Sequence, residues 1–134
     1  MAGYSRRPLI AKLGIKPHTR IAIINPPRGF RATLGTLPPG VTVAANARGA
    51  FSFIHFFVIS RAALESPFPR LARAVEPAVA LGISWPKKAS GVPSDLSEDV
   101  IRAIAVAGGL VDVKVVAVDD VWSGLKLVRR LRDR

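Results

Sequence analysis

The sequence predicts an α/β fold, an open Rossmann-like sheet that is mostly parallel, carries flanking helices and ends in an antiparallel strand. Strand-like runs alternate with helical segments, which is the order that builds parallel sheets. Phe51–Ser60 is apolar at nearly every position, as is typical of a strand covered by helices on both faces. The chain closes with two strand-like runs, Leu110–Val118 and Gly124–Arg129, separated by a short turn. Residues 20–134 are therefore expected to form one such domain, preceded by an N-terminal arm of residues 1–19.

The first half of this domain consists of short elements separated by proline and glycine. One helical turn around Leu9–Leu13 is expected in the arm. Arg20–Asn25 is a β-branched run that two prolines end, because proline cannot continue a central strand. A short helix over Arg28–Leu34 and a brief strand over Val41–Ala44 follow, with a turn rich in glycine and proline between them.

The second half has longer elements. Arg61–Glu76 places apolar residues at helical spacings, but Pro67 and Pro69 interrupt the pattern, so this helix must kink there or begin after them. Val79–Trp85 is the next predicted strand, and Leu96–Ala107 is the next predicted helix.

The loop after Val79–Trp85 lies at the carboxyl end of a strand, where open α/β sheets bind ligands. It runs PKKASGVPSD and leads into the following helix. Ser94 or Asp95 is expected to cap that helix, and Glu98 and Asp99 complement the helix dipole.

Two lysines, a serine and a glycine ahead of free backbone N–H groups favour a pocket for a phosphate, sulfate or carboxylate. The turn after the first strand opens at the same edge of a parallel sheet, so its residues could join this pocket. The candidate anion-binding residues are Asn25, Arg28, Gly29, Trp85, Lys87, Lys88, Ser90, Gly91 and Ser94. Two alternatives stay open: the lysines solvate a turn, and the prolines of the first turn only stiffen it.

No catalytic constellation can be assembled from the sequence. His55 lies in mid-strand and is interpreted as a core or interface histidine. Asp119 and Asp120 favour a turn between antiparallel strands over a carboxylate pair. Ser90 lacks the elbow motif of a serine nucleophile. There is no Walker-type loop and no metal-binding histidine pair, so no cofactor or metal is expected, and enzyme activity is left undecided with a binding role preferred.

Composition excludes several kinds of site. The chain has no cysteine, which rules out disulfides, thiolate metal sites and cysteine nucleophiles. Its start lacks the apolar core of a signal peptide, and its longest apolar stretch is far shorter than the roughly 20 residues of a membrane span. We therefore expect a cytoplasmic protein without membrane contact.

The chain is strongly basic. Twenty Lys and Arg against nine Asp and Glu give a net charge of +11, which attracts polyanions such as nucleic acid. The densest run of cations, and hence the candidate nucleic-acid contact, is Arg129, Arg130, Arg132 and Arg134. The alternative is that the scattered cations serve solubility alone.

Several segments resemble known families. FSFIHFFVIS, ALGISWPKK and GLKLVRR resemble the fourth, fifth and final strands of the Rossmann-like domain of S-adenosylmethionine-dependent methyltransferases, and LARAVEP resembles the end of a helix of that domain. SWPKKASG, DLSEDVIR, GLVDVKV and VWSGLKLVRR are similar to a family of small bacterial proteins of unknown function. The first resemblance implies a truncated methyltransferase-like fold, and the second covers nearly the whole chain without implying an activity.

The chain departs from true methyltransferases where the cofactor would bind. NPPRGF replaces the glycine-rich loop after the first strand, and only Gly29 remains. Its prolines obstruct the close backbone approach that glycines permit. VTVAANARG, at the end of the second predicted strand, lacks the acidic residue that would hold the ribose of the cofactor. The stretch between this strand and Phe51 is too short for another crossover helix, so part of the family domain is expected to be absent. The resemblance therefore implies the fold without the cofactor.

Three hypotheses follow. The leading one is a non-catalytic methyltransferase-like domain that binds a small anionic ligand or a protein partner through the lysine-containing loop. The alternatives are a degenerate S-adenosylmethionine-dependent methyltransferase and a basic nucleic-acid-binding accessory protein. A homodimer is also open, since the final strand could lie at an exposed sheet edge.

Overall fold

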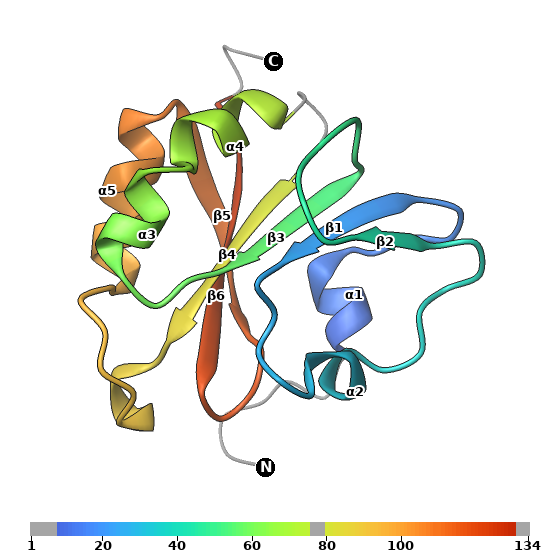
Figure 1. Cartoon of the computed structure of the whole chain (residues 1–134), viewed down its shortest axis with the longest axis horizontal. Coiled ribbons are helices and arrows are strands. Elements are labelled where there is room, and N and C mark those ends of the chain that lie inside the picture. Colours follow the sequence, from blue (N-terminus) through green and yellow to red (C-terminus); the bar gives the residue numbers. More distant parts are fainter. Residues whose placement is uncertain (1–7, 76–79, 131–134) are drawn as a thin grey trace.

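A computed structural model of the chain describes residues 8–75 and 80–130 (Figure 1). The elements are α1 (Leu9–Leu13), β1 (Arg20–Ile24), α2 (Phe30–Leu34), β2 (Thr42–Ala44), β3 (Phe53–Phe57), α3 (Arg61–Glu65), α4 (Phe68–Ala74), β4 (Ala80–Pro86), the 3-10 turn η1 (Lys88–Ser90), α5 (Glu98–Ala107), β5 (Leu110–Ala117) and β6 (Trp122–Arg129).

Six strands form one sheet in the order β2-β1-β3-β4-β6-β5. Strands β1 to β4 are parallel, whereas β6 runs antiparallel to both β4 and β5. This arrangement confirms the predicted open, mostly parallel α/β sheet with an antiparallel last strand.

The final strand does not lie at an edge of the sheet, so that expectation is wrong. The β5–β6 hairpin folds β6 back against β4, and β6 therefore forms ladders on both of its sides. The edges are instead β2 and β5. The sequence argument for a homodimer through the final strand loses its basis, because that strand has no unpaired side to offer.

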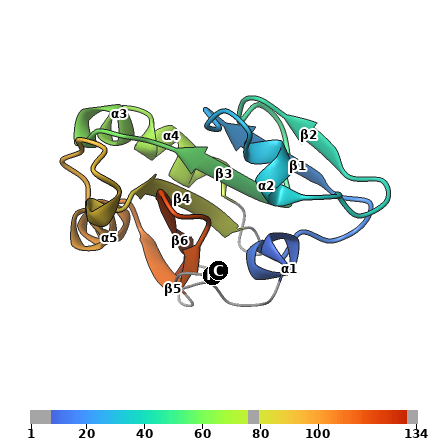
Figure 2. The same ribbon diagram turned by 90° about the horizontal axis from the view of Figure 1, so that it is seen from below.

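Helices cover both faces of the sheet (Figure 2). One core joins the sheet to α3, α4 and α5, and includes the fully buried Leu64 and Ile101. The other core joins the sheet to α1 and α2, and includes Phe30 and Phe57. Central strands β3 and β4 are buried at every position, which explains their almost continuous apolar sequence.

The segment predicted as one interrupted helix forms two short helices. Ser60 caps α3 by accepting a hydrogen bond from the Ala63 N–H at 3.1 Å. Pro67 then stands at the N-cap of α4, where its missing N–H does no harm. The two prolines therefore start a second helix instead of kinking one.

Within residues 8–75 and 80–130, no helix combines the length and the apolar character needed to cross a membrane.

Candidate binding groove beside β4

A groove of about 590 Å³ lies where β4 ends and α5 begins. Its lining consists of Trp85, Pro86, Lys88, Gly91, Val92, Pro93, Ser94, Asp95, Leu96, Ser97 and Glu98. Four candidate residues are thus brought together: Trp85, Lys88, Gly91 and Ser94. Val92 and Pro93 of the same loop also line the groove. The sequence prediction omitted them because it considered residues that could bind an anion, and these two side chains are apolar.

The loop is held in shape by its own serine. The Ser90 hydroxyl donates to the Lys87 carbonyl at 2.6 Å and accepts from the Val92 N–H at 3.2 Å. Gly91 follows with φ of 79°, a left-handed conformation that L side chains rarely adopt. Lys87 and Ser90 do not line the groove, and the Ser90 hydroxyl is engaged within the loop.

Two more side chains tie the loop to the neighbouring βα connection. Ser94 Oγ donates to the Ile59 carbonyl and accepts from the Leu96 N–H at 3.1 Å. Asp95 Oδ1 accepts from the Arg61 N–H at 2.7 Å. The groove wall is therefore fixed to the start of α3.

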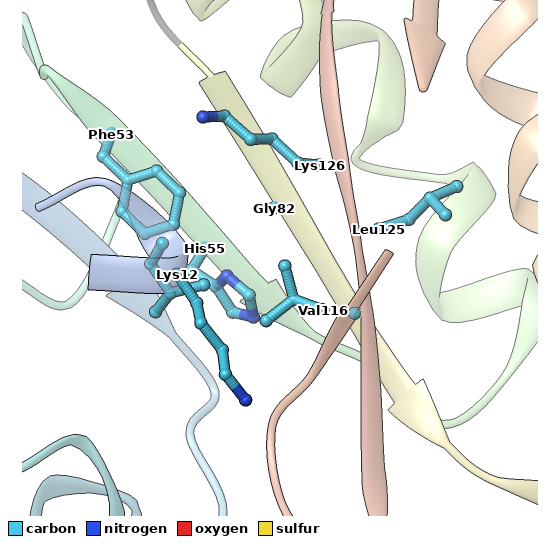
Figure 3. A pocket seen from close by; sticks show the side chains of 9 residues that line it. Lys12, Phe53, His55, Gly82, Val116, Leu125 and Lys126 are labelled. Atoms are coloured by element: carbon cyan, nitrogen blue, oxygen red, sulfur yellow. The ribbon is translucent and has the colours of Figure 1, made fainter. Parts of the chain in front are cut away.

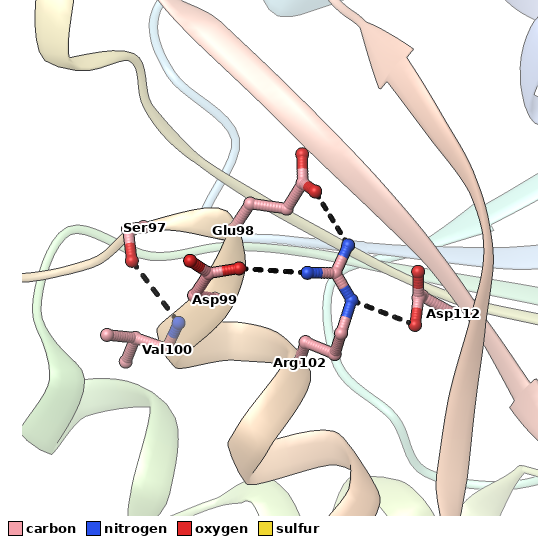
Figure 4. A network of polar contacts seen from close by, with 6 residues as sticks. All are labelled: Ser97, Glu98, Asp99, Val100, Arg102 and Asp112. Atoms are coloured by element: carbon pink, nitrogen blue, oxygen red, sulfur yellow. Dashed lines mark hydrogen bonds and ion pairs between the residues drawn. The ribbon is translucent and has the colours of Figure 1, made fainter.

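The residue that caps α5 is Ser97, and the expectation of a Ser94 or Asp95 cap is wrong. Ser97 Oγ accepts from the Val100 N–H at 3.2 Å (Figure 4). The helix begins at Glu98, three or more residues beyond the expected caps, because those side chains are already bonded to the β3–α3 connection. The predicted acidic first turn is present in Glu98 and Asp99.

The charge in the groove is mixed. The lining residues include one lysine, Lys88, and two carboxylates, Asp95 and Glu98. Glu98 also pairs with Arg102 at 2.6 Å, in a network that includes Asp99 and Asp112 (Figure 4). Hydrogen bonding to Arg102 lowers the pKa of Asp112, and bonds to Glu98 and Asp112 raise the pKa of Arg102. This network joins α5 to the edge strand β5.

The candidate residues after β1 lie elsewhere. Asn25, Arg28 and Gly29 do not line the groove. Aromatic side chains pack between the loop after β1 and the loop after β4. The ring centroid of Phe57 lies 4.7 Å from that of Phe30 on α2 and 5.2 Å from that of Trp122 on β6. Figures 1 and 2 both show the tip of the β5–β6 hairpin between α2 and the loop that follows β4.

The described part of the C-terminal arginine run is engaged in the fold. Arg129 Nε donates to the Val75 carbonyl at 2.6 Å, and an Arg129 terminal nitrogen donates to the Ala72 carbonyl at 3.1 Å. Arg129 thus satisfies carbonyls at the end of α4. Arg130 also has an interaction partner, and Arg132 and Arg134 lie outside the described residues.

The residues considered for catalysis have structural positions. His55 is 2% exposed, and its Nε2 lies 2.6 Å from Ser84 Oγ. Burial lowers the pKa of His55 to about 3, so its imidazole is neutral near pH 7. Asp119 Oδ1 accepts from the N–H groups of Val121 and Trp122 at 2.9 and 2.8 Å, which is the work of a turn residue.

Comparison with known proteins identifies the fold. The sequence matches no protein-family model and no curated protein. A S-adenosylmethionine-dependent methyltransferase from Aquifex aeolicus is similar in structure, with a TM-score of 0.62 and 16% identity over 89% of this chain and 86% of its own. The ribosomal protein L11 methylase of Lactobacillus delbrueckii subsp. bulgaricus has a TM-score of 0.59 and 12% identity, over 91% of this chain and 75% of its own.

A third similar structure is the magnesium protoporphyrin IX methyltransferase of Synechocystis PCC 6803, solved with bound S-adenosylmethionine. Its TM-score is 0.57, with 12% identity over 91% of this chain and 74% of its own. At these identities the likeness concerns the fold, and the chain therefore has a methyltransferase-like α/β fold.

Proposed function

We propose that this chain is a methyltransferase-like domain that acts by binding a protein partner through the groove beside β4. The observation that carries the proposal is the lining of the groove, which combines Trp85 with the apolar Val92, Pro93 and Leu96 and with charged residues of both signs. Val92 is 37% exposed. An aromatic and aliphatic surface with a polar rim is what a protein segment buries on binding.

A partner is favoured over a small anion by the charges and by the serines. The groove is lined by one lysine and two carboxylates, and the hydroxyls of Ser90 and Ser94 are bonded inside the protein. An oxyanion would therefore find few unengaged donors there. The same internal hydrogen bonds hold the loop after β4 in one conformation, so less conformational entropy is lost when a partner binds.

The turn after β1 supports binding over methyl transfer. Asn25 has φ of 55° and Gly29 has φ of 82°, with Pro26 and Pro27 between them. This rigid turn stands where methyltransferases have a glycine-rich loop, whose backbone can approach the cofactor closely because glycine has no side chain.

Site-specific photo-crosslinking in cells tests the proposal. A photoreactive phenylalanine at Val92 should give a discrete crosslinked product, whereas the same residue at Val106, which is 48% exposed on α5, should not. Lys88→Glu should weaken the Val92 product without changing the thermal stability. Equal products at both positions, or none at Val92, would contradict a partner groove.

The degenerate methyltransferase stays an alternative because of the fold likeness alone. Calorimetric titration with S-adenosylhomocysteine separates the two functions. We expect no saturable heat; binding in the micromolar range, about −8 kcal/mol, would show that the proline-rich turn admits the cofactor and would support the enzyme instead.

A further inference from the structure

A second groove lies at the amino edge of the sheet, where the parallel strands begin. It measures about 380 Å³ and lies between the end of α1 and the first residues of β1, β3 and β4. Its polar lining comes from Lys16, Thr19, Ser52 and Lys126. The two grooves share no lining residue, so this surface is separate from the groove beside β4.

Both lysines of the second groove carry an uncompensated charge. Lys126 Nζ lies beside the end of α1, where a Cβ on Gly14 would be 3.7 Å from it. Figure 3 shows Lys126 directed toward the start of β4, whereas Lys12 points the other way and donates to the Ala117 carbonyl at 3.3 Å. Lys16 is exposed, and neither Lys16 nor Lys126 forms an ion pair among the described residues.

A third cation flanks this groove at the start of β1. Arg20 is exposed, donates to the Ala50 carbonyl at 3.4 Å, and places its guanidinium 4.4 Å from the centre of the Phe51 ring. These neighbours are uncharged, so they position the guanidinium without neutralising it. The N–H of Ser52 donates to the Arg20 carbonyl at 2.8 Å, which joins Arg20 directly to a residue of the groove.

The acidic side chains of the described residues lie away from these cations or are already paired. Those that follow the carboxyl ends of the strands, at the other edge of the sheet, are Asp95, Glu98, Asp99, Asp119 and Asp120. The remaining two pair with arginines, Glu65 with Arg61 at 3.3 Å and Asp112 with Arg102 at 3.1 Å. The amino edge is therefore a positively charged surface on a chain of net charge +11, and it attracts polyanions.

We propose that this amino edge binds the phosphate backbone of double-stranded nucleic acid. Lys16, Lys126 and Arg20 each neutralise one phosphate, and the exposed Ser52 hydroxyl donates to a phosphate oxygen. Because phosphates carry no sequence information, binding is independent of base sequence. This surface replaces the C-terminal arginine run as the candidate nucleic-acid contact, since Arg129 is engaged with α4.

The apolar residues of this edge favour a duplex over other polyanions. Phe51 and Phe53 are 5% and 4% exposed, so their rings cannot stack with the unpaired bases of a single strand. No exposed large apolar side chain of the described residues lines the groove, so an anionic membrane would find none to bury there.

Fluorescence anisotropy of a labelled duplex of about 20 base pairs, measured between about 25 and 150 mM salt, tests the proposal. Three neutralised phosphates should make the logarithm of the association constant fall against the logarithm of salt concentration with a slope of about −3. Lys16→Met, Arg20→Met and Lys126→Met should each weaken binding severalfold and reduce the slope by about 1. Lys88→Met removes the same charge from the groove beside β4, and this matched control should leave the slope unchanged.

A slope near zero would overturn the proposal, as would an equal change of slope in Lys88→Met and Lys16→Met, because net charge and not this surface would then determine binding. Tighter binding to polyglutamate or to phosphatidylserine vesicles than to the duplex would assign the surface to an acidic protein or to a membrane instead. Lys16 and Arg20 are exposed, so their variants keep the test decisive even where Lys126→Met disturbs the packing.

Discussion

The contact between Gly82 and His55 makes a sharp prediction for Gly82→Ala. An alanine Cβ on β4 would lie 2.2 Å from Nδ1 and 2.8 Å from Cε1 of the His55 ring. The ring cannot easily move away, because it is bonded to Ser84 and packed against Phe53 and Phe57, with ring centroids at 5.7 and 4.8 Å. Gly82→Ala must therefore displace a fully buried side chain.

The magnitude follows from two terms. Overpacking of a well-packed core costs about 1–3 kcal/mol, and loss of the buried His55–Ser84 hydrogen bond adds about 1 kcal/mol. We expect Gly82→Ala to lower the free energy of unfolding by about 2–4 kcal/mol. In a His55→Ala background the clash has no partner, and alanine is then better than glycine in a strand by about 0.5–1 kcal/mol.

Urea denaturation of the wild type, both single variants and the double variant measures this difference as a double-mutant cycle. Gly82→Ala should destabilise the wild type and stabilise the His55→Ala protein, so the sign of its effect should reverse. An effect of the same sign and size in both backgrounds would refute the proposed packing of His55 against Gly82.

Three further predictions concern charged and titratable groups. Burial lowers the pKa of His55 from 6.5 to about 3, so between these pH values the unfolded chain binds the additional proton and stability falls as pH falls, by about 1.4 kcal/mol per pH unit. Unfolding measured against pH should show this slope in the wild type and in the exposed-site control His18→Asn, and a flatter one in His55→Gln. Arg129→Met should lower the free energy of unfolding by about 1–3 kcal/mol and speed amide exchange in α4, because carbonyls at the end of that helix lose their donor. Arg129→Lys should recover little of this loss, because one amine does not replace the two nitrogens of the guanidinium that donate to these carbonyls. Arg102→Met should raise the pKa of Asp112 toward its ordinary value, and a ¹³C-detected carboxyl titration in which Asp112 does not move would contradict the ion-pair network.

The fold class could be predicted from the sequence because it depends on local pattern. Continuous apolar runs marked β3 and β4 as strands covered on both faces, and both are buried throughout. Prolines and glycines marked the ends of elements, since they restrict or free the backbone wherever they stand. The position of the loop after β4 at the carboxyl edge of the sheet followed from the strand order in the chain.

The tertiary structure alone decided how the polar side chains are used. Ser94 and Asp95 are as suitable for a helix cap as Ser97, but they bond to residues about 35 positions away in the chain, which leaves Ser97 as the cap. The sequence alone could not distinguish a structural Arg129 from a nucleic-acid contact, because the Val75 carbonyl to which it donates lies 54 residues away in the chain. Local pattern depends on neighbours in sequence, whereas hydrogen bonds and cavities depend on neighbours in space, which only the packed chain defines.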